Sequence, residues 1–260
     1  MRKPLQPGMA ALLEVGLMFM PAIPAYLWVW PNLEGTAELL WQALTYVYVL
    51  AGTLYIGLRR WSLSLLGLNR NGLWLSLLCG LAVLLGRLLI ILAIDWEISP
   101  PQTSLPRLLG DILFYIGLVG LVEELLYRGL VYHALEDWLG TRWAIWGSSL
   151  GFALWHIFGQ GLLMGLVSFF IGLYFALFRW RAGGILGLIW LHGLWDLESV
   201  WLIASSSQQI LGAASQLTVL HTGWLYLGTA LLLGVPVYLW WLHPLVIRLL
   251  PRRTGKSSTR

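Results

Sequence analysis

The sequence predicts an all-α, polytopic membrane protein with about eight transmembrane helices and both termini in the cytoplasm. Of its 260 residues, 58% are hydrophobic and only 11% are charged, whereas an ordinary soluble domain carries about 25% charged residues. The apolar residues form continuous runs, and about 20 helical residues are needed to cross the hydrocarbon core of a bilayer. Because these runs lack an alternation of apolar and polar residues, they predict helices rather than a membrane β-barrel.

The predicted spans follow one another along most of the chain. They lie near residues 9–30, 37–58, 73–94, 110–134, 143–160, 162–180, 183–204 and 222–243. The first span follows two basic residues, as a signal peptide would. Glu14 and two prolines interrupt it, however, and no small-residue cleavage motif closes it, so we expect it to be retained.

We expect the whole chain, 1–260, to form a single integral membrane domain. Its parts are the leading helices 9–94, a proline-rich loop 95–109, a core block 108–204, the last helix 222–243 and a basic tail 251–260. The tail is expected to lie near anionic lipid headgroups. The one cysteine, Cys79, lies in an apolar run, so no disulfide framework is predicted.

The orientation follows from the basic residues, which concentrate on the cytoplasmic side of membrane proteins. Placing both termini in the cytoplasm leaves only Arg107 in an opposite loop. The basic residues then on the cytoplasmic side are Arg2, Lys3, Arg59, Arg60, Arg70, Arg142, Arg179, Arg181 and those of the tail. The net charge of +4 therefore reflects topology, and we expect membrane lipid, not nucleic acid, as a partner.

Three charged residues, Glu123, Glu124 and Arg128, lie inside one predicted span. A charge at this depth costs roughly 2.5–3.5 kcal/mol, so such residues usually face the protein interior and serve a function. Glu124 and Arg128 are four residues apart on one helix face and are expected to form a supporting ion pair. Adjacent residues point about 100° apart, so Glu123 lacks a partner in its own helix and is the better catalytic candidate.

Two later spans carry further polar side chains, His156 in one and His192 with Asp196 in the other. At 1.5 Å per helical residue, Glu123 and both histidines fall at similar depths, so we expect them to share a water-filled cavity. A carboxylate and an imidazole that converge on a water act as a general base. A second imidazole beside a short polar side chain suits an oxyanion site. The set predicts hydrolysis of an amide, with Phe152 contributing packing.

Two other classes of protein also place carboxylates and histidines in the membrane. A proton-coupled transporter does so, but it usually shows an internal repeat, and none is visible in the sequence. A non-catalytic scaffold or immunity-type membrane factor of the same fold is the third interpretation. Two further buried charges, Glu14 and Arg87, are expected either to pair with each other or to lie near a leaflet boundary.

Three short motifs resemble those of the CAAX protease and bacteriocin-processing family of intramembrane endopeptidases. They are Glu123-Glu124-Leu125-Leu126-Tyr127-Arg128, Phe152-Ala153-Leu154-Trp155-His156 and His192-Gly193-Leu194-Trp195-Asp196. They match the family patterns E-E-x-x-x-R, F-x-x-x-H and H-x-x-x-N/D in order, and the resemblance covers roughly residues 108–204. It implies an all-helical core whose cavity opens towards the cytoplasm.

The resemblance also implies roles for these residues. Glu123 with His156 would activate the water, and His192 with Asp196 would stabilise the oxyanion. Glu124 and Arg128 would support the site, with Arg128 near the substrate carboxylate. Since eukaryotic members remove the last three residues of prenylated CAAX proteins, the implied substrate is a peptide or protein, in some cases with a lipid-modified C-terminus.

At one position the sequence departs from the eukaryotic pattern, which typically has Asn where this chain has Asp196. An ionised Asp cannot donate a hydrogen bond to an oxyanion, so we expect Asp196 to orient His192 instead. The departure is typical of a bacterial-type branch and favours a location in a bacterial-type cytoplasmic membrane.

The family has been described both as metalloproteases and as metal-independent glutamate proteases. Catalytic zinc sites commonly use three protein ligands, which Glu123, His156 and His192 would supply. The sequence has no H-E-x-x-H pair, however. We therefore predict a metal-independent glutamate mechanism without a cofactor, with zinc as the alternative.

Overall fold

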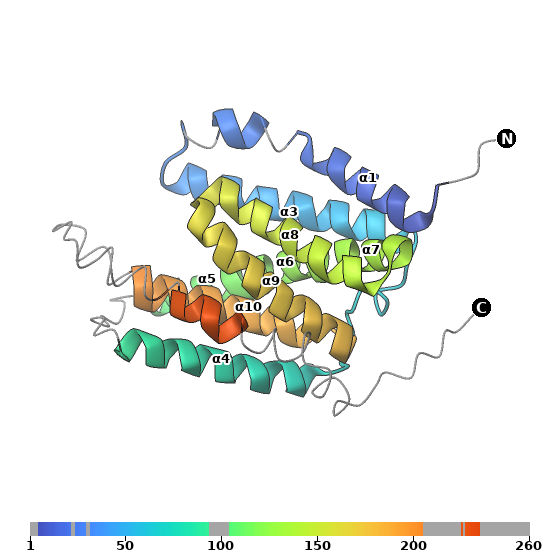
Figure 1. The fold of residues 1–260 in the computed structure, drawn as a ribbon. Helices are drawn as coiled ribbons and strands as arrows, with labels where there is room; N and C mark the ends of the chain where they lie inside the picture. The colour runs from blue at the N-terminus through green and yellow to red at the C-terminus, as the bar shows by residue number, and fades with distance from the viewer. Residues whose placement is uncertain are drawn as a thin grey trace, which may run out of the picture.

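The computed structural model describes residues 5–21, 24–29, 32–93, 104–204, 225 and 227–234. Within these ranges most of the chain is helical, and none of the described residues lies in a β-strand (Figure 1). The predicted all-α class is therefore confirmed. The basic tail and most of the proline-rich loop lie outside the described residues.

The leading part of the chain forms α1 (Pro7–Phe19), a short π-helix η1 (Ala25–Val29), α3 (Thr36–Leu58) and α4 (Leu73–Ala93). The span predicted near 9–30 contains two described helical segments, since α1 ends at Phe19, before Pro21, and η1 begins at Ala25, after Pro24. Each proline lacks a backbone N–H and clashes with the preceding turn, so this double interruption ends the helix.

The central element is one unbroken helical rod from residue 105 to residue 139, which alternates between α- and π-helical turns. It comprises α5 (Leu105–Ile112), η3 (Leu113–Gly120), α6 (Leu121–Glu124), η4 (Leu125–Val131) and α7 (Tyr132–Leu139). Glu123 and Glu124 thus lie in four residues of α-helix between two π-helical segments. Such π-helical turns are rare and frequently occur at functional sites.

The rest of the core is a helical hairpin followed by one more long element. α8 (Thr141–Gln160) and α9 (Leu162–Ala182) are joined at Gly161, and α10 (Leu186–Glu198) continues into η5 (Ser199–Ala204). Gly161 has a φ of +87°, a backbone conformation that favours glycine, so it permits the tight turn between the two helices. These bounds agree with the spans predicted at 143–160, 162–180 and 183–204.

Four of the described helical stretches are long and apolar enough to cross a membrane. They are Thr36–Leu58, Leu73–Ala93, Leu105–Leu139 and Leu162–Ala182. The total of eight spans and the orientation stay predictions. Of the last predicted span, 222–243, residue 225 and residues 227–234 are described, and they are helical.

The rod 105–139 lies at the centre of the bundle (Figure 1). Its η4 and α7 turns pack against α1, α3 and α8, and its η3 and α6 turns pack against α10, while α4 lies on the outer side of α10. Segments that precede the rod in the sequence and segments that follow it therefore surround Glu123 and Glu124.

Two glycines allow α10 to approach the rod closely. A Cβ atom at Gly193 would lie 2.5 Å from the Cα of Ile116, and one at Gly120 would lie 2.6 Å from the carbonyl oxygen of Ile189. Any larger residue would force the two helices apart. This close contact brings His192 next to the two glutamates.

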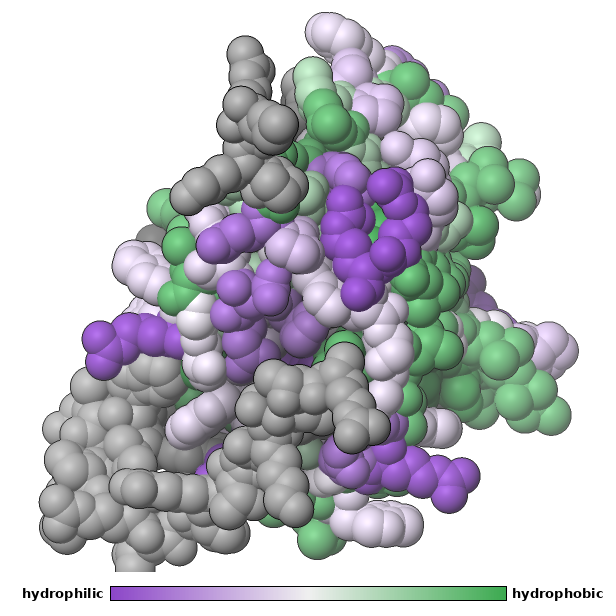
Figure 2. Space-filling view, turned by 90° about the vertical axis from the view of Figure 1, so that its right-hand side faces the viewer, coloured by the Kyte–Doolittle hydropathy of each residue, from purple (hydrophilic) through white to green (hydrophobic). Residues whose placement is uncertain are grey.

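The connections 59–72, 139–141 and 182–186 gather at one end of the bundle (Figure 1). Two of them touch, since Asn69 Nδ2 donates to the carbonyl oxygen of Gly183 at 3.0 Å. Hydrophilic residues collect on this end face, with hydrophobic residues flanking it (Figure 2). The sequence predicts that all three connections lie on the same side of the membrane, and their position at one end of the bundle agrees with this prediction.

Candidate active site

The site is built around the ion pair between Glu124 and Arg128, as the four-residue spacing predicted. Arg128 Nη1 donates to Glu124 Oε1 at 2.9 Å, and both side chains are 0% exposed. The guanidinium carbon of Arg128 lies 4.2 Å from the ring centre of Phe152 and 5.2 Å from that of Phe175. Aromatic faces attract cations, so these rings cover the charge of the arginine.

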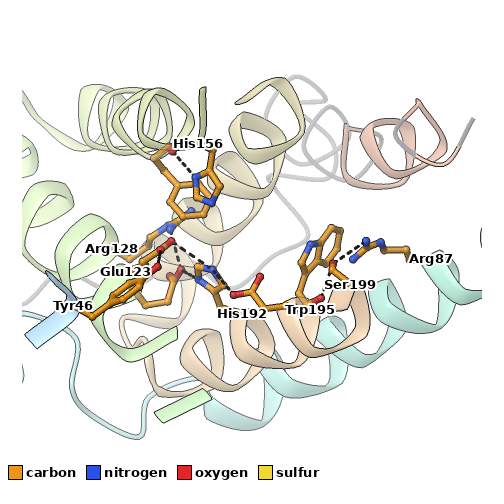
Figure 3. A network of polar contacts seen from close by, with 11 residues as sticks. Tyr46, Arg87, Glu123, Arg128, His156, His192, Trp195 and Ser199 are labelled. Carbon is orange, nitrogen blue, oxygen red and sulfur yellow. Dashed lines mark hydrogen bonds and ion pairs between the residues drawn. The ribbon is translucent and has the colours of Figure 1, made fainter. Parts of the chain in front are cut away.

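Glu124 also forms a hydrogen bond with His192, a contact that the sequence did not predict. Nδ1 of His192 lies 2.8 Å from Glu124 Oε1, the same oxygen that Arg128 contacts. Because an ionised carboxylate only accepts hydrogen bonds, Nδ1 carries the proton and donates it. The ring is thereby fixed, and Nε2 points to the other side, towards Glu123 and Asp196 (Figure 3).

Asp196 was predicted to orient His192, but the orienting bond comes from Glu124. Oδ2 of Asp196 lies 3.7 Å from Nε2 of His192, beyond hydrogen-bond distance. At that distance the carboxylate still acts on the ring through its charge. Asp196 is thus near the reactive nitrogen of His192 rather than on the nitrogen that fixes the ring.

The two oxygens of Glu123 have different surroundings. Oε1 accepts a hydrogen bond from the hydroxyl of Tyr46 at 2.8 Å. Oε2 is buried, has no hydrogen-bond partner among the described residues and lies 3.7 Å from Nε2 of His192. Nε2 is therefore flanked at 3.7 Å by one oxygen from Glu123 and one from Asp196, which suits a water or carbonyl oxygen that bridges these groups.

His156 lies near this group but does not touch Glu123. Its Nδ1 is 2.9 Å from the carbonyl oxygen of Phe152, and its ring centre is 4.4 Å from that of Phe152. The Phe152 ring is in turn 5.6 Å from the His192 ring, so it contacts both imidazoles. Between the described side chains of Glu123 and His156 there is no hydrogen bond or ion pair. Since a carbonyl oxygen only accepts, Nδ1 of His156 is the donor, and Nε2 of the neutral ring is an acceptor.

A small cavity adjoins Glu123 on the side of the leading helices. Its volume is about 20 Å³ for the centres of water-sized spheres, enough for one water. It is lined by Phe19, Thr45, Tyr46, Val49, Val122, Glu123, Leu126, Tyr127 and Trp155. The lining residues come from α1, α3, the central rod and α8, so the leading helices contribute to the site.

A second polar network lies beyond His192, at the C-terminal end of α10 (Figure 3). Arg87 of α4 contacts Glu198 at 3.0 Å and Ser199 Oγ at 3.0 Å, and its guanidinium lies 4.1 Å from the ring of Trp195. The predicted pairing of Arg87 with Glu14 is therefore wrong. Glu14 instead contacts Arg60 at 2.6 Å, because α1 packs on α3.

The ligand set proposed for zinc is not assembled in the described part of the chain. No three His, Cys, Asp or Glu side chains in these ranges are grouped so that they could hold a metal ion. The residues thus do not fit zinc as they stand, and the metal-independent mechanism stays a prediction.

The central part of the chain matches one protein family. The model of Rce1-like type II CAAX prenyl endopeptidases matches residues 105–197. The match begins with α5, ends within α10 and includes Glu123, His156, His192 and Asp196. No curated protein and no solved structure matches the chain. The resemblance inferred from the three motifs is confirmed for residues 105–197, which are similar to the Rce1-like type II CAAX prenyl endopeptidases.

Proposed function

We propose that this protein is an intramembrane endopeptidase in which Glu123 activates the water that attacks a peptide bond. The family match implies protease activity for the family. The observation that carries the proposal for this chain is Oε2 of Glu123. It is a buried carboxylate oxygen that no described residue hydrogen-bonds, 3.7 Å from a histidine nitrogen. A buried charged oxygen left unpaired is costly, so a function is its best explanation.

The reaction begins with the water between Glu123 and the histidines. Oε2 of Glu123 takes one proton while the water oxygen forms a bond to the carbonyl carbon of the substrate. The acceptor Nε2 of His156 orients the same water. The negative charge that develops on the carbonyl oxygen is stabilised by Nε2–H of a doubly protonated His192.

The tetrahedral intermediate then collapses. Glu123 returns its proton to the amide nitrogen, the C–N bond breaks, and an amine and a carboxylic acid leave. Glu124 holds the His192 ring throughout, since its carboxylate accepts the Nδ1–H bond. Asp196 balances the positive charge of that ring from 3.7 Å. Arg128 neutralises Glu124 and does not take part in proton transfer.

The exposed surface of the helices supports a substrate class. Large hydrophobic side chains are exposed on most of the described helices, as expected for lipid contact. The substrate is therefore a peptide or protein that reaches the site from the membrane, with a lipid-modified C-terminus as the form that the family name suggests. We place the protein in a bacterial-type cytoplasmic membrane.

The test compares wild-type protein with Glu123→Gln and His156→Ala. C-termini of membrane proteins are read by mass spectrometry from cells that carry each version. New C-termini seen with wild type are expected to be absent with either variant. Glu34→Gln is the matched control, because Glu34 is an exposed glutamate near the start of α3, far from the site in sequence.

The same variants separate the competing functions. If Glu123→Gln folds normally and still produces every cleaved C-terminus, the protease assignment fails. Proton flux into liposomes that depends on Glu123 would favour a transporter. Full complementation of a deletion strain by Glu123→Ala would favour a non-catalytic scaffold or immunity-type factor.

A further inference from the structure

We infer that Tyr46 of α3 is a positioning residue that determines which oxygen of Glu123 takes the proton in the reaction. This rests on the proposed function of Glu123. The hydroxyl of Tyr46 donates to Oε1 of Glu123 at 2.8 Å across 77 residues of sequence. Tyr46 lies outside the family match at 105–197, so neither the motifs nor the family match assigns it a role.

The ring of Tyr46 has an aromatic neighbour and borders the small cavity next to Glu123. It packs edge-on against the ring of Phe114 with 6.0 Å between centres. It also lines the small cavity next to Glu123, together with Val49 and Tyr127. The side chain of Tyr46 reaches Glu123 from α3, and its hydroxyl donates to the carboxylate (Figure 3).

The hydrogen bond from Tyr46 makes the two carboxylate oxygens of Glu123 chemically different. The last torsion of a free glutamate is broad and nearly two-fold, so its two oxygens exchange easily. A hydrogen bond to an ionised acceptor is about twice as strong as a neutral one, and here it occupies Oε1. Oε2 is then left without a bond from the described residues and directed at Nε2 of His192, at 3.7 Å. Tyr46 thereby selects the basic oxygen without touching the reacting atoms.

The experiment removes only the hydroxyl, with Tyr46→Phe. Losing a hydrogen bond to a charged group corresponds to a drop in kcat of about 10- to 100-fold. KM should stay within about twofold, since Tyr46 acts on the carboxylate and not on the substrate. Kinetics are measured on purified protein in liposomes with a peptide that the wild type cleaves.

Tyr48→Phe is the matched control. Tyr48 lies on the same helix, and its hydroxyl donates to the carbonyl oxygen of Met18 in α1 at 2.9 Å. Each variant thus loses one hydrogen bond between elements, but only Tyr46→Phe affects Glu123. We expect similar unfolding of both variants and full activity from Tyr48→Phe. Equal losses of kcat in the two would show a structural effect of α3 and overturn the inference.

A second comparison tests whether Tyr46 acts through Glu123. Residual cleavage by Glu123→Gln should be unchanged, within about twofold, when Tyr46→Phe is added, because the carboxylate is already gone. A further loss of the full 10- to 100-fold would show that Tyr46 acts independently. If Tyr46→Phe does not fold, p-aminophenylalanine at position 46 keeps a donor there and should restore most of the rate.

The outcomes distinguish this inference from the proposed function. Full activity of a folded Glu123→Gln would reject the proposed function itself. Full activity of Tyr46→Phe beside an inactive Glu123→Gln would reject only the role of Tyr46.

Discussion

Replacing Arg128 by Met tests whether the Glu124–Arg128 pair is structural. Both side chains are 0% exposed, and Nη1 of Arg128 shares Glu124 Oε1 with Nδ1 of His192. Arg128→Met leaves a buried carboxylate that keeps its bond from His192 but loses its positive partner. Breaking one side of a buried pair costs about 3–5 kcal/mol, so the free energy of unfolding should fall by that amount.

The companion variant, Glu124→Gln with Arg128→Met, removes both charges. A buried pair replaced by neutral groups of similar size is often nearly neutral for stability, so the double variant should recover all but about 1–2 kcal/mol. Its protease activity should stay low. The amide oxygen of Gln at position 124 would still accept the hydrogen bond from His192, but it would carry no negative charge to stabilise the protonated His192 ring. Recovery of stability without recovery of activity would separate the two roles of Glu124.

Unfolding is followed by tryptophan fluorescence during SDS titration in mixed micelles, and the 17 tryptophans provide a strong signal. Glu14→Gln is the control, since Glu14 is 31% exposed in its pair with Arg60 and should cost at most about 1 kcal/mol. Glu124→Gln is also measured alone. If its loss and that of Arg128→Met simply add in the double variant, the pair has no coupling energy and the structural role of the pair is refuted.

Three further predictions concern the close helix contact, Asp196 and metal ions. Gly193→Ala should lower stability by about 1–3 kcal/mol and reduce kcat, because its Cβ would meet the backbone of Ile116. Gly117→Ala, with open space around its Cβ, should be tolerated, and equal effects in the same SDS titration would contradict the packing argument. Asp196→Asn should lower kcat by about tenfold if the charge near His192 matters; an undiminished rate in liposomes would instead give this position a hydrogen-bond-donor role. Treatment with 1,10-phenanthroline should leave kcat unchanged, and a loss that zinc restores would contradict the metal-independent mechanism.

The sequence predicted those features that depend on local spacing. The pair of Glu124 and Arg128 is present because residues four apart meet on one helix face even next to π-helical turns. The helix bounds of the core agree with the apolar runs because lipid and helix geometry fix their length. His192 lies beside the glutamates, as its depth suggested.

Features that depend on which helices touch were not predictable from spacing. The bond from Tyr46 to Glu123 joins residues 77 apart, and the pair of Arg87 and Glu198 joins residues 111 apart. Tyr46 shows no local signal, since Tyr48 lies two residues away in an equally apolar context. Glu123 and His156 were expected at a similar depth in the membrane, but no hydrogen bond or ion pair joins their described side chains. Depth gives only the position along the membrane normal, whereas the position of the His156 ring within the membrane plane depends on its packing against Phe152. The number of spans and their orientation stay predictions.

The π-helical turns beside Glu124 have a consequence for insertions and deletions in the chain. Their hydrogen bonds enclose one residue more per turn than those of an α-helix. Deleting one residue within Leu125–Val131 would remove the extra residue and let the segment close as an α-helix, so the helix beyond it would keep nearly the same orientation about its axis. Asp137, whose carboxylate accepts a bond from the backbone N–H of Gly8 at 2.9 Å, would then still face α1. The same deletion in α7, which is α-helical, would rotate the residues beyond it by about 100°.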